Sequence, residues 1–191
     1  KLSATADKAG LVTFAEKFGD SSYARLARLA VFKLDFAELD QQSIPALQQF
    51  SATYTTAKLN SFVSEYVAKG KAVNLRAQAN NNAAVVTQFV NDTSVQVIDK
   101  QGEWLRVLQP DNTYGWLHKS VVAERINSGF QLEVQQYMAS AGKNSRDLLY
   151  RDAAAANNAA PMLTFLQLYP RDNAAAQIRQ RLVSYYRTEN T

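Results

Sequence analysis

The feature that most constrains the fold of this chain is a block of short strand-like segments in its middle. Residues 72–123 contain five runs rich in β-branched and aromatic residues: AVNLRAQ, AAVVTQFV, TSVQVID, EWLRVLQ and YGWLHKSVV. Turn-forming sequences such as ANNN, NDT and PDNT separate these runs. Because five short strands in about 50 residues can bury only a small core, the block predicts a compact β-barrel.

Two of the predicted strands form an antiparallel hairpin. The sequence SVQVIDKQGEWLRVL alternates apolar and polar residues on both sides of a turn that contains Gly102. A second turn, QPDNTYGW, follows directly and carries a Pro-Asp-Asn sequence that favours a chain reversal. The two tryptophans of the chain, Trp104 and Trp116, stand on either side of this second turn.

The segments on either side of the block have helical periodicity. Residues 5–69 and residues 126–188 carry apolar stripes with the spacing of amphipathic helices, and turns break each arm into two antiparallel hairpins. Ser43 is expected to cap one helix. Gly70 and Gly142 are expected to end two others. The stripes of the N-terminal arm include Leu47/Phe50/Tyr54 and Leu59/Phe62/Tyr66.

Two of the predicted helical hairpins are similar to each other. FAEKFGDSSYARLAR and FLQLYPRDNAAAQIR share paired aromatic residues, a polar turn with a capping residue, an alanine and a closing arginine. They resemble tetratricopeptide-type hairpins of bacterial envelope proteins over residues 8–39 and 159–187, although the tryptophan and glycine positions of the standard repeat are absent. Such repeats bind partners in grooves. A plain helical bundle explains the same stripes, and both interpretations stay open.

The strand-rich block resembles the bacterial SH3 (SH3b) family. The order and spacing of its segments and both tryptophans agree with the family pattern, whereas AQAN replaces the usual SGPS and Asn91 stands at a usual glycine. The segments that carry the resemblance are VNLRAQAN at 73–80, VVTQFVNDTSVQVI at 85–98, GEWLRVL at 102–108 and YGWLHKSVV at 114–122. The resemblance implies a small barrel that binds a ligand on one side.

Together these features predict an α+β protein. A small five-stranded SH3-like β-barrel is expected to be inserted between, or cradled by, N- and C-terminal antiparallel helical hairpins. The expected domains are residues 1–70, 71–124 and 125–191, with the two helical arms packed together. The joins between them are short and lack the proline- or serine-rich character of a flexible linker.

The resemblance also indicates where a ligand would bind. Trp104 matches a tryptophan that lies on the ligand face of SH3-like barrels, although packing at the barrel rim is an equal alternative. Trp116 matches a tryptophan that packs across the barrel end. His118 and Val121 stand where eukaryotic SH3 domains have the proline and tyrosine of a polyproline groove, so polyproline recognition is not expected. The candidate ligand-binding residues are Trp104, Tyr114, His118, Asn80, Asn81 and Asn82.

Composition and motifs argue against catalysis and nucleic-acid binding. The chain has no cysteine and a single histidine, His118, which removes thiol nucleophiles, disulfides and zinc-cysteine sites. It has no Gly-x-Ser-x-Gly elbow and no glycine-rich phosphate loop. The net charge of +4 is spread thinly over the chain and forms no basic stripe. We therefore expect no catalytic residue, no metal, no cofactor and no nucleic-acid partner.

Three functions fit these features. The first is a non-catalytic adaptor of the bacterial cell envelope that holds a protein or a cell-wall peptide. The second is a dedicated peptidoglycan binder, and the third is a regulatory or targeting tail of a larger enzyme. A periplasmic or otherwise extracytoplasmic location is expected from the resemblance and from a first residue, Lys1, that indicates a processed or trimmed chain. No apolar run approaches the roughly 20 residues needed to span a membrane.

Overall fold

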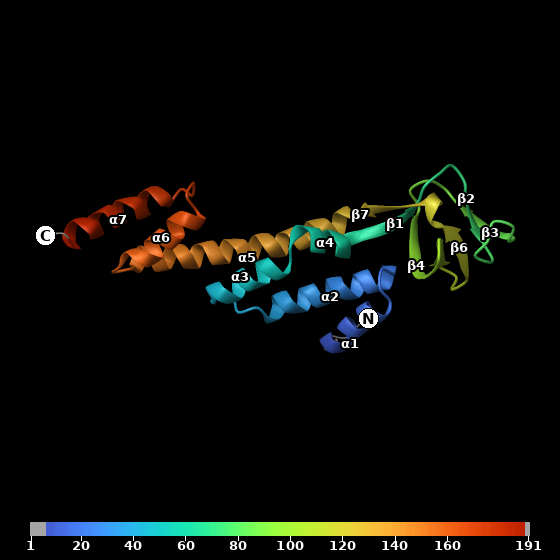
Figure 1. The fold of residues 1–191 in the computed structure, drawn as a ribbon, viewed down its shortest axis with the longest axis horizontal. Coiled ribbons are helices and arrows are strands. Elements are labelled where there is room, and N and C mark those ends of the chain that lie inside the picture. Colours follow the sequence, from blue (N-terminus) through green and yellow to red (C-terminus); the bar gives the residue numbers. More distant parts are fainter. Residues whose placement is uncertain (1–6, 190–191) are drawn as a thin grey trace. The chain divides into compact units, whose positions relative to one another are not determined.

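The computed structural model describes residues 7–189 of the chain, and these residues form an α+β protein (Figure 1). The helices are α1 (Lys8–Lys17), α2 (Ser22–Glu38), α3 (Ile44–Thr53), α4 (Thr56–Val63), α5 (Ser128–Ala155), α6 (Ala159–Leu168) and α7 (Ala175–Glu189). The strands are β1 (Ser64–Ala68), β2 (Val73–Arg76), β3 (Val85–Phe89), β4 (Ser94–Gln101), β5 (Trp104–Leu108), β6 (Tyr114–His118) and β7 (Val122–Ile126), and the short 3₁₀ helix η1 is Lys119–Val121.

The described residues form two compact units, and neither unit is one continuous segment. Unit 1 contains the residues up to Ala37 together with Tyr54–Val134, and unit 2 contains Glu38–Thr53 together with the residues from Gln135 onward. All seven strands lie in unit 1. The three-domain division expected from the sequence stays a prediction.

The strands of unit 1 form one antiparallel sheet in the order β3-β2-β6-β5-β4-β1-β7. One side of this sheet faces a compact apolar core, in which alternate residues of β2, β4, β5 and β6 are buried. This core contains Tyr66, Ala68, Val73, Leu75, Val95, Val97, Leu105, Val107 and Leu117. The α+β class is thus confirmed, but the sheet has seven strands rather than five and is open rather than closed, with β3 and β7 at its ends.

Two strands were missing from the five-stranded prediction: β1 lies in sequence that had been assigned to the N-terminal helical arm, and β7 runs from the end of the predicted barrel into the C-terminal arm. Helix α4 ends at Val63, and Tyr66 is a buried residue of β1 instead of part of a helical stripe. Because a short strand that directly follows a helix can continue the helical apolar spacing by chance, the stripe could not separate the two. The β1–β7 pair joins α4 and α5 to the sheet (Figure 1).

Helix α2 is anchored on the sheet through Arg25, which is 6% exposed. Its Nη1 donates to Ser64 Oγ at 2.6 Å and its Nη2 to Tyr66 Oη at 2.7 Å, both on β1. Nη2 also lies 3.1 Å from a carboxylate oxygen of Glu124 on β7. The guanidinium stands 4.1 Å from the centre of the Tyr66 ring. One arginine therefore joins a helix to both strands that connect the sheet to the helices.

The turn between α1 and α2 continues this attachment along β4. Ser22 Oγ accepts a hydrogen bond from the backbone N–H of Val97 at 3.0 Å. Tyr66 Oη donates to the carbonyl of Asp20 at 3.0 Å, and the Asp20 carboxylate pairs with Lys100 at 2.9 Å. These contacts satisfy part of the edge of β4 that β1 does not cover, which limits unwanted strand pairing there.

Several helices begin directly after a residue whose side chain accepts a hydrogen bond from a backbone N–H of the first turn. Ser43 Oγ accepts from the N–H of Ala46 at 3.3 Å, so the predicted cap of α3 is confirmed. Ser21 Oγ accepts from the N–H of Ala24 at 3.1 Å at the start of α2. Asn158 caps α6 in the same way.

The two glycines expected to end helices do not do so. Gly142 lies inside α5, which runs without interruption from Ser128 to Ala155. Gly70 lies in the loop after β1, with a φ of +140°. The prediction failed because a glycine at the edge of an apolar stripe looks the same whether the helix stops or continues with the glycine on its exposed side.

Gly142→Ala is expected to stabilise unit 2. A Cβ built at this exposed position meets nothing within 4 Å, and alanine in a helix interior is favoured over glycine by about 0.5–1 kcal/mol. The melting temperature followed by far-ultraviolet circular dichroism should rise, and the amides of α5 around this position should exchange more slowly. A lower melting temperature would show instead that the chain depends on glycine at this point.

Unit 2 has its own apolar core, formed by Leu149, Ala153, Met162, Phe165 and Ile178. A two-bond ion pair between Arg146 and Asp172 lies beside it, with N–O distances of 2.9 and 2.5 Å. Arg146 is the main reason that the pKa of Asp172 is lowered to about 2. The helical character of both arms is confirmed, whereas their resemblance to tetratricopeptide hairpins stays a prediction.

Candidate ligand-binding face

The outward side of the sheet carries a group of aromatic and cationic side chains. Because residues of β2, β5 and β6 alternate in direction, the neighbours of the buried Leu75, Leu105 and Leu117 point away from the core. We call this group the aromatic face, and it consists of Arg76, Trp104, Arg106, Tyr114, Trp116 and His118.

The strand register arranges the aromatic face in rows. Trp104 stands directly opposite His118, and their ring centroids are 5.2 Å apart in an edge-to-face arrangement. Arg106 stands opposite Trp116, which in turn stands opposite Arg76 on β2. The structure therefore brings two predicted ligand residues into direct contact and places Trp116, which was expected to pack across the barrel end, partly buried between two arginines.

His118 also has a local structural role. His118 caps η1, because its Nδ1 accepts a hydrogen bond from the N–H of Ser120 at 3.3 Å. The same nitrogen lies 2.8 Å from Ser120 Oγ. In the neutral imidazole the proton is therefore on Nε2. A serine close to a histidine can form a catalytic pair, but here the same nitrogen is engaged by the backbone of that serine, which is the geometry of a cap.

Tyr114 forms the other end of the face together with Arg106. The Arg106 guanidinium lies over the tyrosine ring at 3.7 Å from its centre, and Tyr114 is 50% exposed. Arg106 was not predicted as a site residue. Its position two residues after Trp104, on the same side of β5, was the sequence signal that could have indicated it.

The predicted asparagines lie at the margin of the face. Asn80, Asn81 and Asn82 are exposed in the loop after β2, and β6 separates that strand from Trp104 on β5. The loop is held by its own hydrogen bonds, including Asn82 N–H to Asn80 Oδ1 at 3.0 Å. Arg76 donates to the carbonyl of Ala83 at 2.8 Å, which connects the loop to the face.

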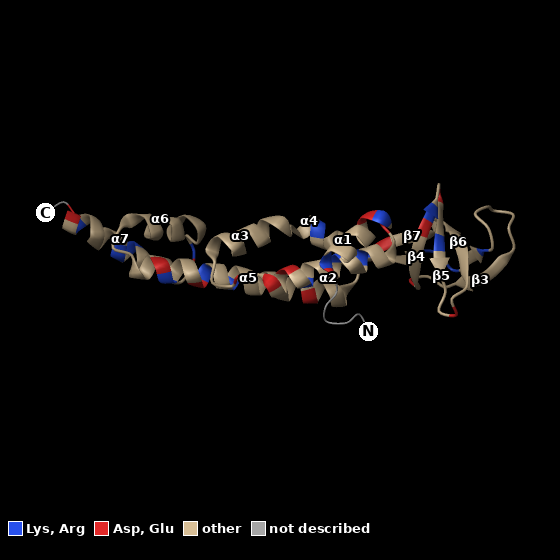
Figure 2. Ribbon diagram, turned by 90° about the horizontal axis from the view of Figure 1, so that it is seen from below, with Lys and Arg blue, Asp and Glu red and all other residues tan. Residues whose placement is uncertain are grey.

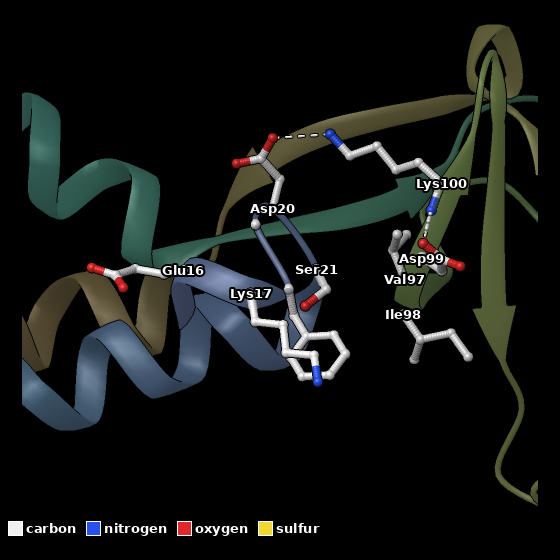
Figure 3. A pocket seen from close by; sticks show the side chains of 10 residues that line it. Glu16, Lys17, Asp20, Ser21, Val97, Ile98, Asp99 and Lys100 are labelled. Atoms are coloured by element: carbon white, nitrogen blue, oxygen red, sulfur yellow. Dashed lines mark hydrogen bonds and ion pairs between the residues drawn. The ribbon is translucent and has the colours of Figure 1, made fainter. Parts of the chain in front are cut away.

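A separate hollow of about 300 Å³ lies between the α1–α2 turn and β4 (Figure 3). Lys100 is the main cause of a lowered pKa for the carboxyl of Asp20, and Asp20 raises the pKa of the Lys100 ammonium. Asp99 accepts a hydrogen bond from the N–H of Lys100 at 2.8 Å. Because these charges already satisfy one another, we favour the aromatic face as the ligand site.

The charges elsewhere are mixed in sign. Figure 2 shows acidic and basic residues interspersed along α5 rather than gathered by sign. Within residues 7–189, no three histidine or acidic side chains are grouped so that they could hold a metal ion. The same residues include no helix with the length and apolar character required to cross a membrane.

Residues 71–123 match the family model of the bacterial SH3 domain. The match covers β2 to β6, and hence every residue of the aromatic face, together with η1 and the start of β7, while β1 and the helices α1 to α7 lie outside it. A search of the curated proteins found no match to the chain. The strand-rich segment is therefore a bacterial SH3 domain, and SH3 domains generally bind proteins or peptides.

Proposed function

We propose that the chain is a non-catalytic binding module of the bacterial cell envelope, which holds a protein or a cell-wall peptide on the aromatic face of its SH3 domain. The observation that carries this proposal is the continuity of the face. Trp104 and His118 are in ring contact, and Tyr114 and Arg106 are stacked on the adjoining part of the same two strands.

The residue types of the face are those that dominate binding energy at protein interfaces. Tryptophan, tyrosine and arginine supply large contact areas with few rotatable bonds, and they are enriched among residues whose truncation weakens binding most. They are mounted on hydrogen-bonded strands rather than on loops, which keeps their geometry fixed before a ligand arrives. Such a rigid platform suits recognition of an extended peptide.

A binding role also accounts for His118 better than a catalytic role does. Its Nδ1 caps η1 and its ring packs against Trp104, so both features have a structural use. The envelope location is supported by the bacterial SH3 match, since such domains in wall-active enzymes are the family precedent for cell-wall binding. A dedicated peptidoglycan binder is the second candidate, and it would use the same face.

Co-sedimentation of the purified chain with isolated bacterial sacculi tests the proposal. Trp104→Ala should weaken sedimentation at least about tenfold, because truncating a tryptophan of a binding surface is among the most costly changes to affinity. Tyr186→Ala is a matched control, since Tyr186 is an aromatic residue of α7 in unit 2 and is 46% exposed. Its binding should equal that of the unmodified chain.

The outcomes separate the candidates. Binding that Trp104→Ala abolishes supports recognition of the cell wall by the aromatic face. Binding that both variants retain would contradict this face as the site. If the unmodified chain does not sediment, peptidoglycan is not the ligand, and peptide arrays derived from envelope proteins become the next test of the same variants. Circular dichroism and Trp116 fluorescence verify that each variant is folded.

A further inference from the structure

Arg106 differs from the other arginines that the structure partly or fully buries. Arg25, Arg28, Arg76 and Arg146 each donate to a carbonyl, hydroxyl or carboxylate of the chain. Arg106 makes no such bond with any residue of the described range, and its Nε is buried without an acceptor. Leaving buried donors unpaired is unfavourable, which makes an unpaired guanidinium on a proposed binding surface informative.

The acidic residue that stands opposite Arg106 on the neighbouring strand does not pair with it. Asp99 is the cross-strand partner of Arg106, but the register between β4 and β5 shifts between Val97 and Asp99. The Asp99 carboxylate accepts from the N–H of Lys100 instead and lines the hollow shown in Figure 3. Arg106 therefore has an acid opposite it in the sheet but forms no ion pair with that acid or with any other described residue.

The orientation of Arg106 leaves its donors usable. The ring of Tyr114 covers one side of the guanidinium, with its centre 3.7 Å from the guanidinium carbon. Nε is the one Arg106 nitrogen buried without an acceptor, so the terminal N–H groups, which bond to no described residue, stay accessible to a ligand. A guanidinium held in this way offers two parallel N–H donors, and a carboxylate can accept one hydrogen bond from them at each of its oxygens. The stacked tyrosine holds these donors in place before a ligand binds.

From these observations we infer that Arg106 receives a carboxylate of the ligand, and that the ligand of the aromatic face is an acidic peptide. This inference rests on the proposed function, because it specifies the ligand of the same face. The carboxylate supplies the acceptor that Arg106 lacks within the sheet, while Trp104 and Trp116 contact the apolar parts of the peptide on either side.

The position of Arg106 favours an aspartate or glutamate side chain over a peptide terminus. Arg106 is the middle residue of β5, with Trp104 before it and Leu108 after it on the same outward side. A peptide that places its carboxylate on Arg106 can therefore continue in both directions along the face. A peptide that placed its C-terminal carboxylate on Arg106 would end there, and the face on one side of Arg106 would stay uncovered.

Titration with three synthetic peptides tests the inference. The probes are the doubly blocked pentapeptide acetyl-Ala-Leu-Glu-Leu-Ala-amide, its glutamine counterpart, and the glutamine peptide with a free terminal carboxylate. The readout is the side-chain Nε–Hε signal of Arg106 in a ¹⁵N–¹H correlation spectrum, which is assigned by its absence from Arg106→Gln. The glutamate peptide should shift this signal and bind about tenfold more tightly than the glutamine peptide.

The variants provide matched comparisons. Arg106→Gln should remove the preference for glutamate, and Arg106→Lys should recover only part of it, because an ammonium keeps the charge but not the two parallel donors. Arg151→Gln, at an exposed arginine of α5, should leave the preference unchanged.

Each outcome decides the inference separately from the proposed function. Equal affinity for the glutamate and glutamine peptides, or a preference that Arg106→Gln retains, overturns the role of Arg106 even where sacculus binding depends on Trp104. A response to the free terminus alone overturns the choice of a side-chain carboxylate. A glutamate preference that depends on Arg106 supports the inference even where sacculi are not bound, and the ligand is then an acidic protein segment.

Discussion

Arg25→Ala is expected to lower the free energy of unfolding of unit 1 by about 3 kcal/mol. The change removes two charge-assisted hydrogen bonds to β1, the ion pair with Glu124 and the stacking on Tyr66, together with the packing of a buried side-chain stem. Because both tryptophans lie in the sheet, denaturant titration followed by tryptophan fluorescence measures this loss directly.

Two variants of helix α2 make the Arg25 experiment specific. Arg25→Lys should recover less than half of the loss, since one ammonium cannot reach Ser64, Tyr66 and Glu124 at the same time. Lys33→Ala, also on α2, removes an exposed ion pair with Glu133 of α5 and should cost less than about 1 kcal/mol. If Arg25→Lys is as stable as the unmodified chain, a positive charge is enough to hold α2 on the sheet, and the hydrogen bonds of the guanidinium to Ser64 and Tyr66 add no stability.

Gly115→Ala is expected to destabilise the sheet by about 2–3 kcal/mol. A Cβ at this position would lie 2.5 Å from Leu75 Cγ and 2.9 Å from the carbonyl oxygen of Arg76. The leucine is fully buried and the carbonyl belongs to the neighbouring strand, so neither can move without disturbing the core or the ladder. The glycine allows β6 to approach β2 closely beside Trp116.

Unfolding followed by tryptophan fluorescence measures the Gly115→Ala effect, and Gly142→Ala is its matched control. The same substitution is made in both variants, but at Gly142 the added Cβ meets open space. The fluorescence transition should therefore move to lower denaturant concentration for Gly115→Ala and should not do so for Gly142→Ala. A Gly115→Ala variant as stable as the unmodified chain would mean that β2 and β6 can separate at little cost.

The sequence predicted the inner part of the sheet better than its ends. Strands β2 to β6 alternate apolar and polar residues between recognisable turns, which is a local signal. β1 and β7 each adjoin a helix and lack alternating burial, since β1 has three buried residues in succession and β7 has none, so their apolar spacing suited a helix equally well. Whether a sheet closes depends on pairing between its first and last strands, and no local pattern carries that information.

The candidate site was predictable where residue type alone was distinctive. Trp104 and His118 were identified from the family resemblance, and the structure places their rings in contact. Arg106 was missed, because an arginine on the outer side of a strand reads like any solvated charge. Its importance depends on the missing ion pair with Asp99, the residue opposite it, and on the stacking with Tyr114, and both are visible only in the folded sheet.

The two segments of unit 2 are separated in the chain by residues 54–134 of unit 1. The loss of chain entropy on folding is therefore smallest if unit 1 folds first. Gln41 and Asn144 of unit 2 are hydrogen bonded although 103 residues separate them in the chain. Closing so long a loop is unfavourable while the intervening residues are unstructured. Once the sheet has formed, the hydrogen bond from Asn127 N–H to the Val63 carbonyl holds the two ends of the Tyr54–Val134 segment close together. Folding of the SH3 segment therefore shortens the search that brings α3 to the rest of its unit.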